Sequence, residues 1–445
     1  MRLFNGLLEA LFARSRWPGR DLLEQTSSDR PGKVLDLLDL AGELLAERSQ
    51  SSGVQQGRQL ILAYRHLADS KKTAFLLALA RGFAPDAATI RRALDAYDAA
   101  PSARALSRVS NAAEAPRQEL LRRLNQAPMA TAALVEMRAD LLARLSANPD
   151  LRTLDDDFVH LLRSWFNRGF LVMRRIDWSS PADLLERVIR YEAVHSIATW
   201  DELRDRLLPP DRRCYGFFHP ALGEEPLIFV EVALTATVPE SIGALLEPER
   251  GILEAKYAQA AVFYSISNCQ PGLAGISFGQ FLIKQVVDDL AGELPWLKTF
   301  VTLSPIPGFL KWLGQSAQAG DGDARLSLAD GVPDLSWSRD DPRTRSRLAL
   351  AARYFLTERD SRGGLIDPVA RFHVGNGARV DRLCWVGDTS SRGMAQSGGL
   401  MVNYVYDLPT LQANRDGYAR NRTVAAGPAV TAMLDPKDAV MRATG

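Results

Sequence analysis

The sequence predicts an α+β protein in which an all-helical bundle precedes a domain of mixed helices and strands. Apolar residues over about the first 170 positions recur at the three-four spacing of amphipathic helices. Later segments instead contain runs of consecutive β-branched and large apolar residues, as buried strands do. A chain of 445 residues also exceeds the usual size of one hydrophobic core. We therefore expect a helical domain over 1–170 and a mixed domain over 171–445.

The helical part shows its periodicity in several separate segments. The apolar positions at helical spacing are Val34, Leu38, Ala41 and Leu45, then Ile90, Leu94 and Tyr97, then Leu134, Met137, Leu141 and Leu145. Asp86 and Thr131 are predicted to begin two of these helices, and Thr153 with Asp156 resembles a capping box. We find no catalytic constellation here, so the bundle is expected to serve packing and self-association.

The second part alternates strand and helix signals. Strands are predicted at 226–235, 261–267 and 298–303, and a helix at 276–290. A further helix is expected to open at Ser180-Pro181 and to carry Tyr191, Glu192 and His195. The segment from Gly320 to Gly331 is typical of a polar surface loop.

Composition excludes several classes of protein. The 54 basic and 53 acidic residues leave no excess charge to attract nucleic acid or an anionic membrane. No run of about 18 apolar residues occurs, so no membrane span is expected. The three widely spaced cysteines fit neither a zinc pattern nor paired disulfides and indicate reduced thiols in a cytosolic protein. The first 16 residues are predicted to form a short amphipathic helix rather than a secretory or mitochondrial leader.

A glycine-bearing turn between a predicted strand and a predicted helix is the most informative local feature. It runs from Asn268 to Gly275, and such a turn can present backbone N–H groups to a pyrophosphate. The same glycines equally fit a turn with no ligand. The turn has neither the P-loop ending nor the Rossmann spacing, which disfavours a nucleotide hydrolase and a dinucleotide-dependent dehydrogenase.

Two further segments contain side chains suited to acid–base chemistry. Ser304 begins a Ser-Pro-Ile-Pro-Gly-Phe string directly after a predicted strand, where the prolines would stiffen the loop. His373 lies just before an Asn-Gly turn, and histidine is the side chain best suited to exchange a proton near neutral pH. Each residue also fits a purely structural role, as a turn serine and as a buried histidine. His195 and His219 are the rival histidines, while no chemistry is expected of the remaining two.

Two other kinds of site lack support. The histidines do not pair at zinc-ligand spacing, so no metal is predicted. No G-x-S-x-G elbow surrounds Ser304, which disfavours a serine hydrolase.

These segments, with several others in the same order, resemble the malonyl-CoA decarboxylase family. The matching strings are WFNRGFLVMRRIDW (165–178), YEAVH (191–195), RRCYGFFHPALGEEPLIFVEVALT (212–235), the stretch 263–313, the stretch 367–378 and GGLMVNYVY (398–406). The first 150 residues resemble the family mainly in helical character.

The resemblance implies a helical oligomerisation domain followed by a catalytic domain with the acetyltransferase-like (GNAT) fold, assembled as a tetramer. It implies that Ser304 and His373 are the catalytic pair. It also implies a CoA-contacting loop formed by Gln270, Gly272, Leu273, Ala274, Gly275 and Ile276. Compared with the acetyltransferase pattern Q-x-x-G-x-G, the first glycine arrives one position early here.

The expected reaction converts malonyl-CoA to acetyl-CoA and carbon dioxide without a metal or prosthetic group, because the thioester itself accepts the electrons. A GNAT-type acyltransferase remains the alternative enzyme, and a scaffold that senses acyl-CoA remains the non-enzymatic one. Lys284 and Lys311 fit either phosphate contacts or solvated helix faces. The chain ends without a Ser-Lys-Leu peroxisomal signal, so a cytoplasmic enzyme is expected.

Overall fold

The computed structural model describes residues 32–276, 282–334 and 336–434. These residues divide into two compact units. The first contains the described residues up to Leu171, with the short segments His219–Gly223 and 270–276. The second contains Val172–Phe218, Glu224–Cys269 and the described residues from Leu282 onward. The two units are described separately.

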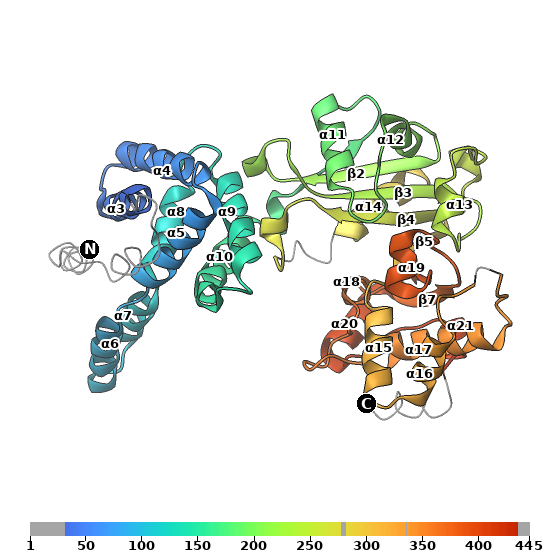
Figure 1. Cartoon of the computed structure of the whole chain (residues 1–445). Coiled ribbons are helices and arrows are strands. Elements are labelled where there is room, and N and C mark those ends of the chain that lie inside the picture. Colours follow the sequence, from blue (N-terminus) through green and yellow to red (C-terminus); the bar gives the residue numbers. More distant parts are fainter. Residues whose placement is uncertain (1–31, 277–281, 335, 435–445) are drawn as a thin grey trace. The chain divides into compact units, whose positions relative to one another are not determined.

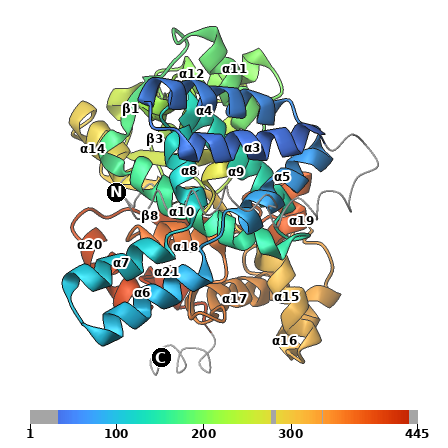
Figure 2. The same cartoon turned by 90° about the vertical axis from the view of Figure 1, so that its left-hand side faces the viewer.

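The first unit is all-helical, as the sequence predicts (Figure 1). Its helices are α3 (Gly32–Ala46), α4 (Gln50–Arg65), α5 (Asp69–Gly82), α6 (Ala87–Ala99), α7 (Ala103–Ala113), α8 (Pro116–Leu124), α9 (Ala130–Arg144) and α10 (Arg152–Trp165), with short 3₁₀ turns η1 (Pro149–Leu151), η2 (Arg168–Phe170), η3 (Pro220–Leu222) and η5 (Pro271–Leu273). Helices α3, α4, α5, α8, α9 and α10 pack on one another through buried apolar side chains, including the faces predicted in α3 and α9, while α6 and α7 form a hairpin (Figure 2). The face predicted in α6, with Ile90, Leu94 and Tyr97, is not buried.

One predicted helix start is confirmed and two are wrong. Asp86 caps α6 by accepting hydrogen bonds from Ala88 and Thr89. Helix α9 instead begins after Met129, whose backbone is left-handed, and the Thr131 hydroxyl donates to the Asn125 side chain. Thr153 lies inside α10, because η1 runs directly into that helix. Tertiary packing therefore places these helix ends differently from local capping signals.

The second unit is built on one mixed sheet. Its strands are β1 (Val172–Ile176), β2 (Arg212–Phe218), β3 (Pro226–Thr235), β4 (Ala260–Asn268), β5 (Thr299–Thr302), β6 (Ser304–Pro305), β7 (Arg379–Cys384) and β8 (Met401–Val405). The order is β1-β2-β3-β4-β5-β8-β6, with β7 also paired to β8, and only β4 and β5 are parallel. An antiparallel meander with one parallel crossover through a helix is the acetyltransferase-like (GNAT) arrangement, so the predicted fold class is confirmed.

The three predicted strands are present as β3, β4 and β5. Strand β3 is buried at every position except its last, which explains why its sequence is apolar without alternation. The predicted crossover helix is α14 (Leu282–Glu293). Ile276, where the prediction begins, is not helical, and 277–281 lie outside the described residues.

The other helices of this unit cover the sheet and its connections. They are α11 (Ala182–Tyr191), α12 (Trp200–Leu207), α13 (Ile242–Leu246), α15 (Phe309–Gln318), α16 (Gly322–Ala329), α17 (Pro342–Leu356), α18 (Pro368–Gly375), α19 (Ser391–Ser397), α20 (Leu411–Asn421) and α21 (Pro428–Thr431), with the 3₁₀ turn η4 (Ala255–Tyr257). Leu184, Leu185 and Val188 of α11 pack in one apolar cluster with side chains of β2 and β3.

Two local predictions for this unit are wrong. Helix α11 ends at Tyr191, because the Glu192 carboxylate accepts from the backbone of Val194 and His195 and turns the chain there. The predicted surface loop at 320–331 contains α16, since Asp321 caps a helix that the glycine-rich ends obscure.

Candidate active site

The sheet holds Ser304 at the point where two strands meet β8. Strand β5 pairs with the end of β8, and β6 pairs with its start, so Ser304 lies opposite Val402. The following prolines lead into α15, and Gly308 is required there because a Cβ would lie 2.4 Å from the Tyr354 hydroxyl. The backbone around the serine is therefore fixed on both sides, and its side chain is buried.

Helix α18 carries His373 into the same region. Asp367 caps the helix by accepting from the backbone N–H groups of Val369 and Ala370, and Pro368 occupies the first helical position. His373 lies in the last turn, ahead of Gly377 with its φ of +90°. The Asn-Gly signal therefore marks the end of the helix, and the histidine points from its last turn into the protein with only 3% of its surface exposed.

The structure brings the two predicted side chains together. Ser304 Oγ lies 3.3 Å from His373 Nε2, although the residues are 69 positions apart in the chain. On its other side the ring contacts Tyr406, whose hydroxyl lies 2.7 Å from Nδ1. Ser304 Oγ in turn donates to Thr302 Oγ1 at 2.8 Å. The four side chains form one continuous line of hydrogen bonds.

Burial sets the protonation states along this line. It lowers the pKa of His373 from 6.5 to about 3, since the charged ring would lose its hydration. It raises the pKa of Tyr406 well above its usual value of 10. At neutral pH the imidazole is therefore uncharged and the phenol keeps its proton.

Polar groups of β8 hold Thr302, the hydrogen-bond partner of Ser304, in place. The backbone N–H of Tyr404 donates to Thr302 Oγ1 at 3.2 Å, and Asn403 Nδ2 donates to the Thr302 carbonyl at 2.9 Å. The Tyr404 ring also stacks on His373 with a centroid distance of 4.6 Å. Sequence reasoning assigned no chemistry to Thr302 or Tyr406, although Tyr406 ends a string that resembles the family.

The predicted CoA loop belongs to the helical unit, where it packs on α9. Gly272 and Leu273 are buried, whereas Ala274 and Gly275 are exposed. A Cβ at Gly272 would lie 1.8 Å from the Val135 carbonyl oxygen, so this glycine permits a close approach to α9. Gly275 has a φ of +75°, which other residues rarely adopt.

Arg138 of α9 holds this loop. Its Nη1 donates to the carbonyls of Gly272 and Ala274 at 2.7 and 2.8 Å, and its Nε donates to Asp155 at 2.8 Å. Because the arginine is 2% exposed, these bonds are shielded from water. The loop conformation therefore depends on one buried guanidinium.

The rival histidines and the two lysines have other partners. His219 caps η3 and lies 3.1 Å from the Trp165 carbonyl, which gives it a structural role. His195 lies outside any helix, and burial lowers its pKa to about 4. Lys284 pairs with Asp288 on its own helix, and Lys311 is exposed.

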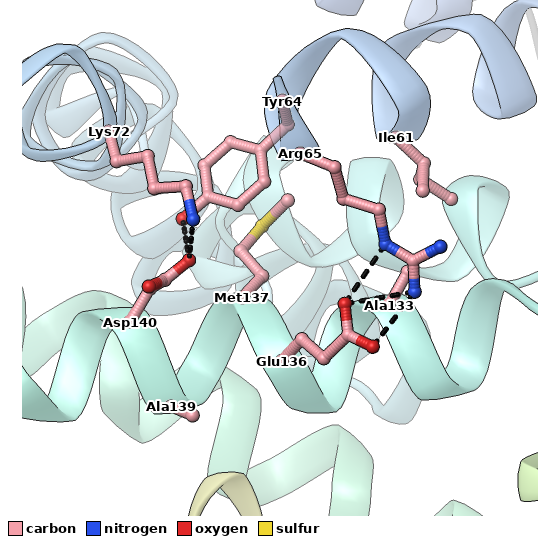
Figure 3. A pocket seen from close by; sticks show the side chains of 9 residues that line it. All are labelled: Ile61, Tyr64, Arg65, Lys72, Ala133, Glu136, Met137, Ala139 and Asp140. Carbon is pink, nitrogen blue, oxygen red and sulfur yellow. Dashed lines mark hydrogen bonds and ion pairs between the residues drawn. The ribbon is translucent and has the colours of Figure 1, made fainter. Parts of the chain in front are cut away.

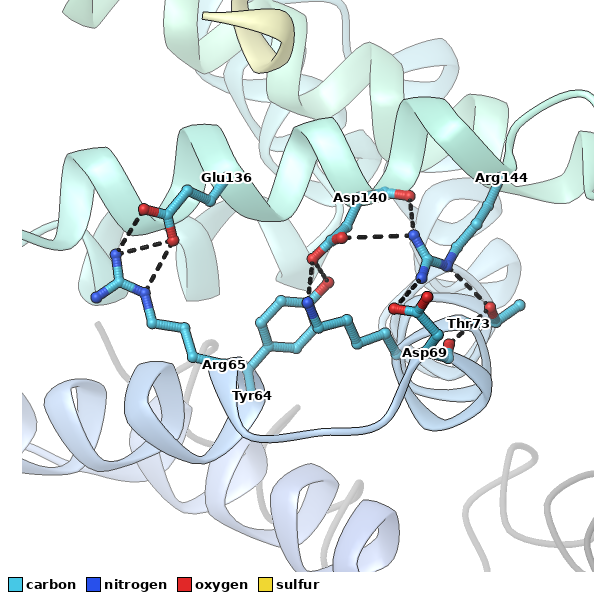
Figure 4. A network of polar contacts seen from close by, with 8 residues as sticks. Tyr64, Arg65, Asp69, Thr73, Glu136, Asp140 and Arg144 are labelled. Atoms are coloured by element: carbon cyan, nitrogen blue, oxygen red, sulfur yellow. Dashed lines mark hydrogen bonds and ion pairs between the residues drawn. The ribbon is translucent and has the colours of Figure 1, made fainter. Parts of the chain in front are cut away.

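The helical unit also contains a cavity of about 280 Å³ between α4, α5 and α9 (Figure 3). Its charged side chains are already paired with one another. Lys72 and the Tyr64 hydroxyl both donate to Asp140 (Figure 3). Arg65 pairs with Glu136 (Figure 4). This network is expected to fix the helices and leaves no unpaired charge for a ligand.

Several features bear on metals, thiols and membranes. No group of three metal-ligating side chains occurs within 32–276, 282–334 and 336–434. Cys214, Cys269 and Cys384 are free and buried. In the same described ranges no helix has the length and apolar character needed to cross a bilayer.

The fold and the buried hydroxyl–imidazole pair define an acetyltransferase-like protein with a candidate acid–base site. Models of the malonyl-CoA decarboxylase N-terminal and C-terminal domains match residues 83–166 and 169–444. The chain belongs to the malonyl-CoA decarboxylase family.

Relatives match along most of the chain. The mitochondrial malonyl-CoA decarboxylase of Anser anser anser is 30% identical, over 96% of this chain and 94% of that protein. The mitochondrial enzyme of Mus musculus is 32% identical over 88% and 87%. The solved malonyl-CoA decarboxylase of Rhodopseudomonas palustris is 53% identical, with a TM-score of 0.86 over 89% of this chain and 98% of that one. That of Agrobacterium vitis is 48% identical, with a TM-score of 0.83 over 90% and 100%.

The close approach at Gly272 generates a stability prediction. Gly272→Ala should lower the free energy of unfolding by about 3 kcal/mol, because the added methyl group meets the α9 backbone. Gly292→Ala is the matched control, since its Cβ meets nothing within 4 Å on helix α14, and it should be neutral or stabilising by up to about 1 kcal/mol. Urea denaturation followed by circular dichroism measures both changes, and equal effects would contradict the predicted clash.

Arg138 generates a second prediction. Arg138→Met should cost about 3 kcal/mol, because it leaves Asp155 and the carbonyls of Gly272 and Ala274 without their donor. Hydrogen exchange at 272–275 should become faster.

Arg65→Met provides the control for this change. Its ion pair with Glu136 is exposed, with side-chain exposures of 40% and 60%, so the loss should stay below about 1 kcal/mol. Unchanged exchange in Arg138→Met would show that the arginine does not hold the loop.

Proposed function

We propose that this chain decarboxylates malonyl-CoA to acetyl-CoA and carbon dioxide, using Ser304 and His373. The observation that carries the proposal is the 3.3 Å approach of the serine hydroxyl to a buried, uncharged imidazole, in a chain that belongs to a family of carboxy-lyases.

The chemistry requires stabilisation of negative charge. When the carbon–carbon bond breaks, its electron pair moves to the α-carbon and onto the thioester oxygen as an enolate. A hydrogen-bond donor pre-aimed at that oxygen contributes about 3 to 4 kcal/mol to the barrier reduction. The thioester is the electron acceptor, so the proposal includes no metal or prosthetic group.

The pair is then proposed to protonate the enolate carbon. Two routes fit this pair: direct donation by a His373 imidazolium and a relay through Ser304. Burial of His373 favours the relay, because the charged ring is disfavoured in the substrate-free site. In this proposal Ser304 contacts the substrate and His373 replaces the serine proton.

Binding of CoA is assigned to the loop of Gln270, Gly272, Leu273, Ala274, Gly275 and Ile276. The exposure of Gly275 supports this assignment, since a main-chain N–H suits a pyrophosphate, whereas the Ala274 N–H donates to the Pro271 carbonyl at 3.0 Å. Buried Gly272 and Leu273 would act by shaping the loop rather than by direct contact.

Assembly as a homotetramer and a cytoplasmic location are proposed as well. The balanced charge and the three free cysteines support the location, while the relatives from Anser anser anser and Mus musculus are mitochondrial malonyl-CoA decarboxylases. Native mass measurement and cell fractionation test these two points.

A carbon-dioxide release assay on malonyl-CoA tests the function. The wild-type chain should release carbon dioxide with a chelator present, and His373→Ala should lose at least about 100-fold in kcat, because the proton that Ser304 gives up is no longer replaced. His66→Ala is the control, since His66 is exposed and bonds only to its own helix.

Three outcomes would contradict parts of this proposal. Full activity of a folded His373→Ala variant would remove the proposed donor. Release of free CoA only after an amine is added would indicate acyl transfer. Binding of malonyl-CoA without turnover by the wild-type chain would indicate a sensor.

A further inference from the structure

Tyr406 is fixed against His373 by more than one contact. Its backbone N–H donates to the Phe300 carbonyl at 2.8 Å, which ties the residue after β8 to β5. Its ring packs against Phe263 at a centroid distance of 6.3 Å, and only 2% of its surface is exposed. The hydroxyl therefore reaches Nδ1 from a rigid position.

The hydrogen-bond partners define a direction along the line. In the described part of the chain, His373 Nδ1 is the partner of the Tyr406 hydroxyl. A buried phenol that keeps its proton must donate it, so Nδ1 accepts. The hydrogen of the neutral ring then lies on Nε2 and points to Ser304 Oγ, while the Ser304 hydroxyl donates to Thr302.

A neutral imidazole in this tautomer cannot give up its Nε2 proton unless Nδ1 receives one. Without that exchange the ring would become an imidazolate, which is far too basic to form near neutral pH. A proton source on the Nδ1 side is therefore needed for any relay through this ring, and Tyr406 occupies that side.

We propose that Tyr406 is a positioning residue that acts through His373, holding its tautomer and supplying the proton that Nδ1 takes up as Nε2 releases its own. The proposal rests on the decarboxylation proposed above.

Three linked proton transfers account for the protonation of the enolate. The enolate carbon takes the Ser304 hydroxyl proton, Ser304 takes the Nε2 proton of His373, and Nδ1 takes the Tyr406 proton. Tyr406 is left as a phenolate and His373 as its Nδ1–H tautomer. After the product leaves, a proton from water enters through Ser304 to Nε2, and Nδ1 returns its proton to Tyr406, which restores the Nε2–H tautomer. The direction is favourable because the carbanion of a thioester enolate is a much stronger base than a phenolate.

Charged groups around the ring are paired elsewhere. On α18, Asp367 accepts from backbone N–H groups, and Arg371 pairs with Asp360. On α20 and β7, which pack against α18, the ion pairs are Arg415–Asp416, Arg379–Asp381 and Arg382–Glu240. The titratable neighbours from β8 and the residue after it are Tyr404 and Tyr406. The pH dependence is therefore expected to come from the relay itself.

Tyr406→Phe tests the inference, because it removes the hydroxyl and keeps the ring. In the wild type, kcat should stay level from about pH 5 to 9, since the neutral ring is the working form. In the variant only an imidazolium can pass a proton. Because pH 7 is four units above the His373 pKa of about 3, kcat should fall about 10,000-fold at pH 7 and drop about tenfold for each further pH unit. KM should stay within about twofold.

Tyr264→Phe is the matched control. Tyr264 is equally buried on β4, its hydroxyl has no hydrogen-bond partner among the described residues, and it does not contact His373. This variant should keep the wild-type kcat and pH profile.

Nitrogen-15 spectra of histidine-labelled protein should show a single Nε2–H tautomer for His373 in the wild type and a mixture in Tyr406→Phe.

Each result decides between specific alternatives. Wild-type kcat in Tyr406→Phe, or a reduced kcat with a level pH profile, would overturn the relay.

If Tyr406→Phe does not fold, 3,5-difluorotyrosine at 406 keeps the ring and hydroxyl but lowers the phenol pKa. The relay then predicts an alkaline loss of kcat at lower pH than in the wild type, and an unchanged profile would overturn it. No carbon dioxide from the wild type would instead contradict the proposed function.

Discussion

The candidate site depends on the removal of one imidazole from water. His373 is uncharged because it lies at the buried end of α18, between the Tyr404 ring and the Ser304 hydroxyl. A charged ring here would lose hydration without gaining a carboxylate partner. The site must therefore handle protons by passing them between neutral groups, and this constraint gives the hydroxyls of Ser304 and Tyr406 their importance.

Strand β8 brings these groups together. It pairs with β5, β6 and β7, and it contributes Asn403 and Tyr404 to the support of Thr302 and leads directly into Tyr406. Because each of these residues is held by backbone hydrogen bonds, the hydroxyl groups are positioned by the sheet rather than by flexible loops.

In the helical unit, Gly272 and Arg138 hold the proposed CoA loop in one conformation. Gly272 allows the 270–276 loop to lie directly on α9, and Arg138 bonds two of its carbonyls. A loop held in this way keeps the exposed Gly275 and its main-chain N–H in a fixed conformation. Preorganised N–H groups bind an anion with a smaller entropy cost than mobile ones.

The sequence by itself determined the helical first part, strands β3 to β5 and the chemical candidates Ser304 and His373, because periodicity and residue type are local properties. The tertiary structure decided which groups meet, since Thr302, Ser304, His373 and Tyr406 come from separate elements. It also decided the helix starts at Ala130 and Arg152, where packing overrides capping signals. The protonation state of His373 likewise follows from burial, which no local pattern specifies.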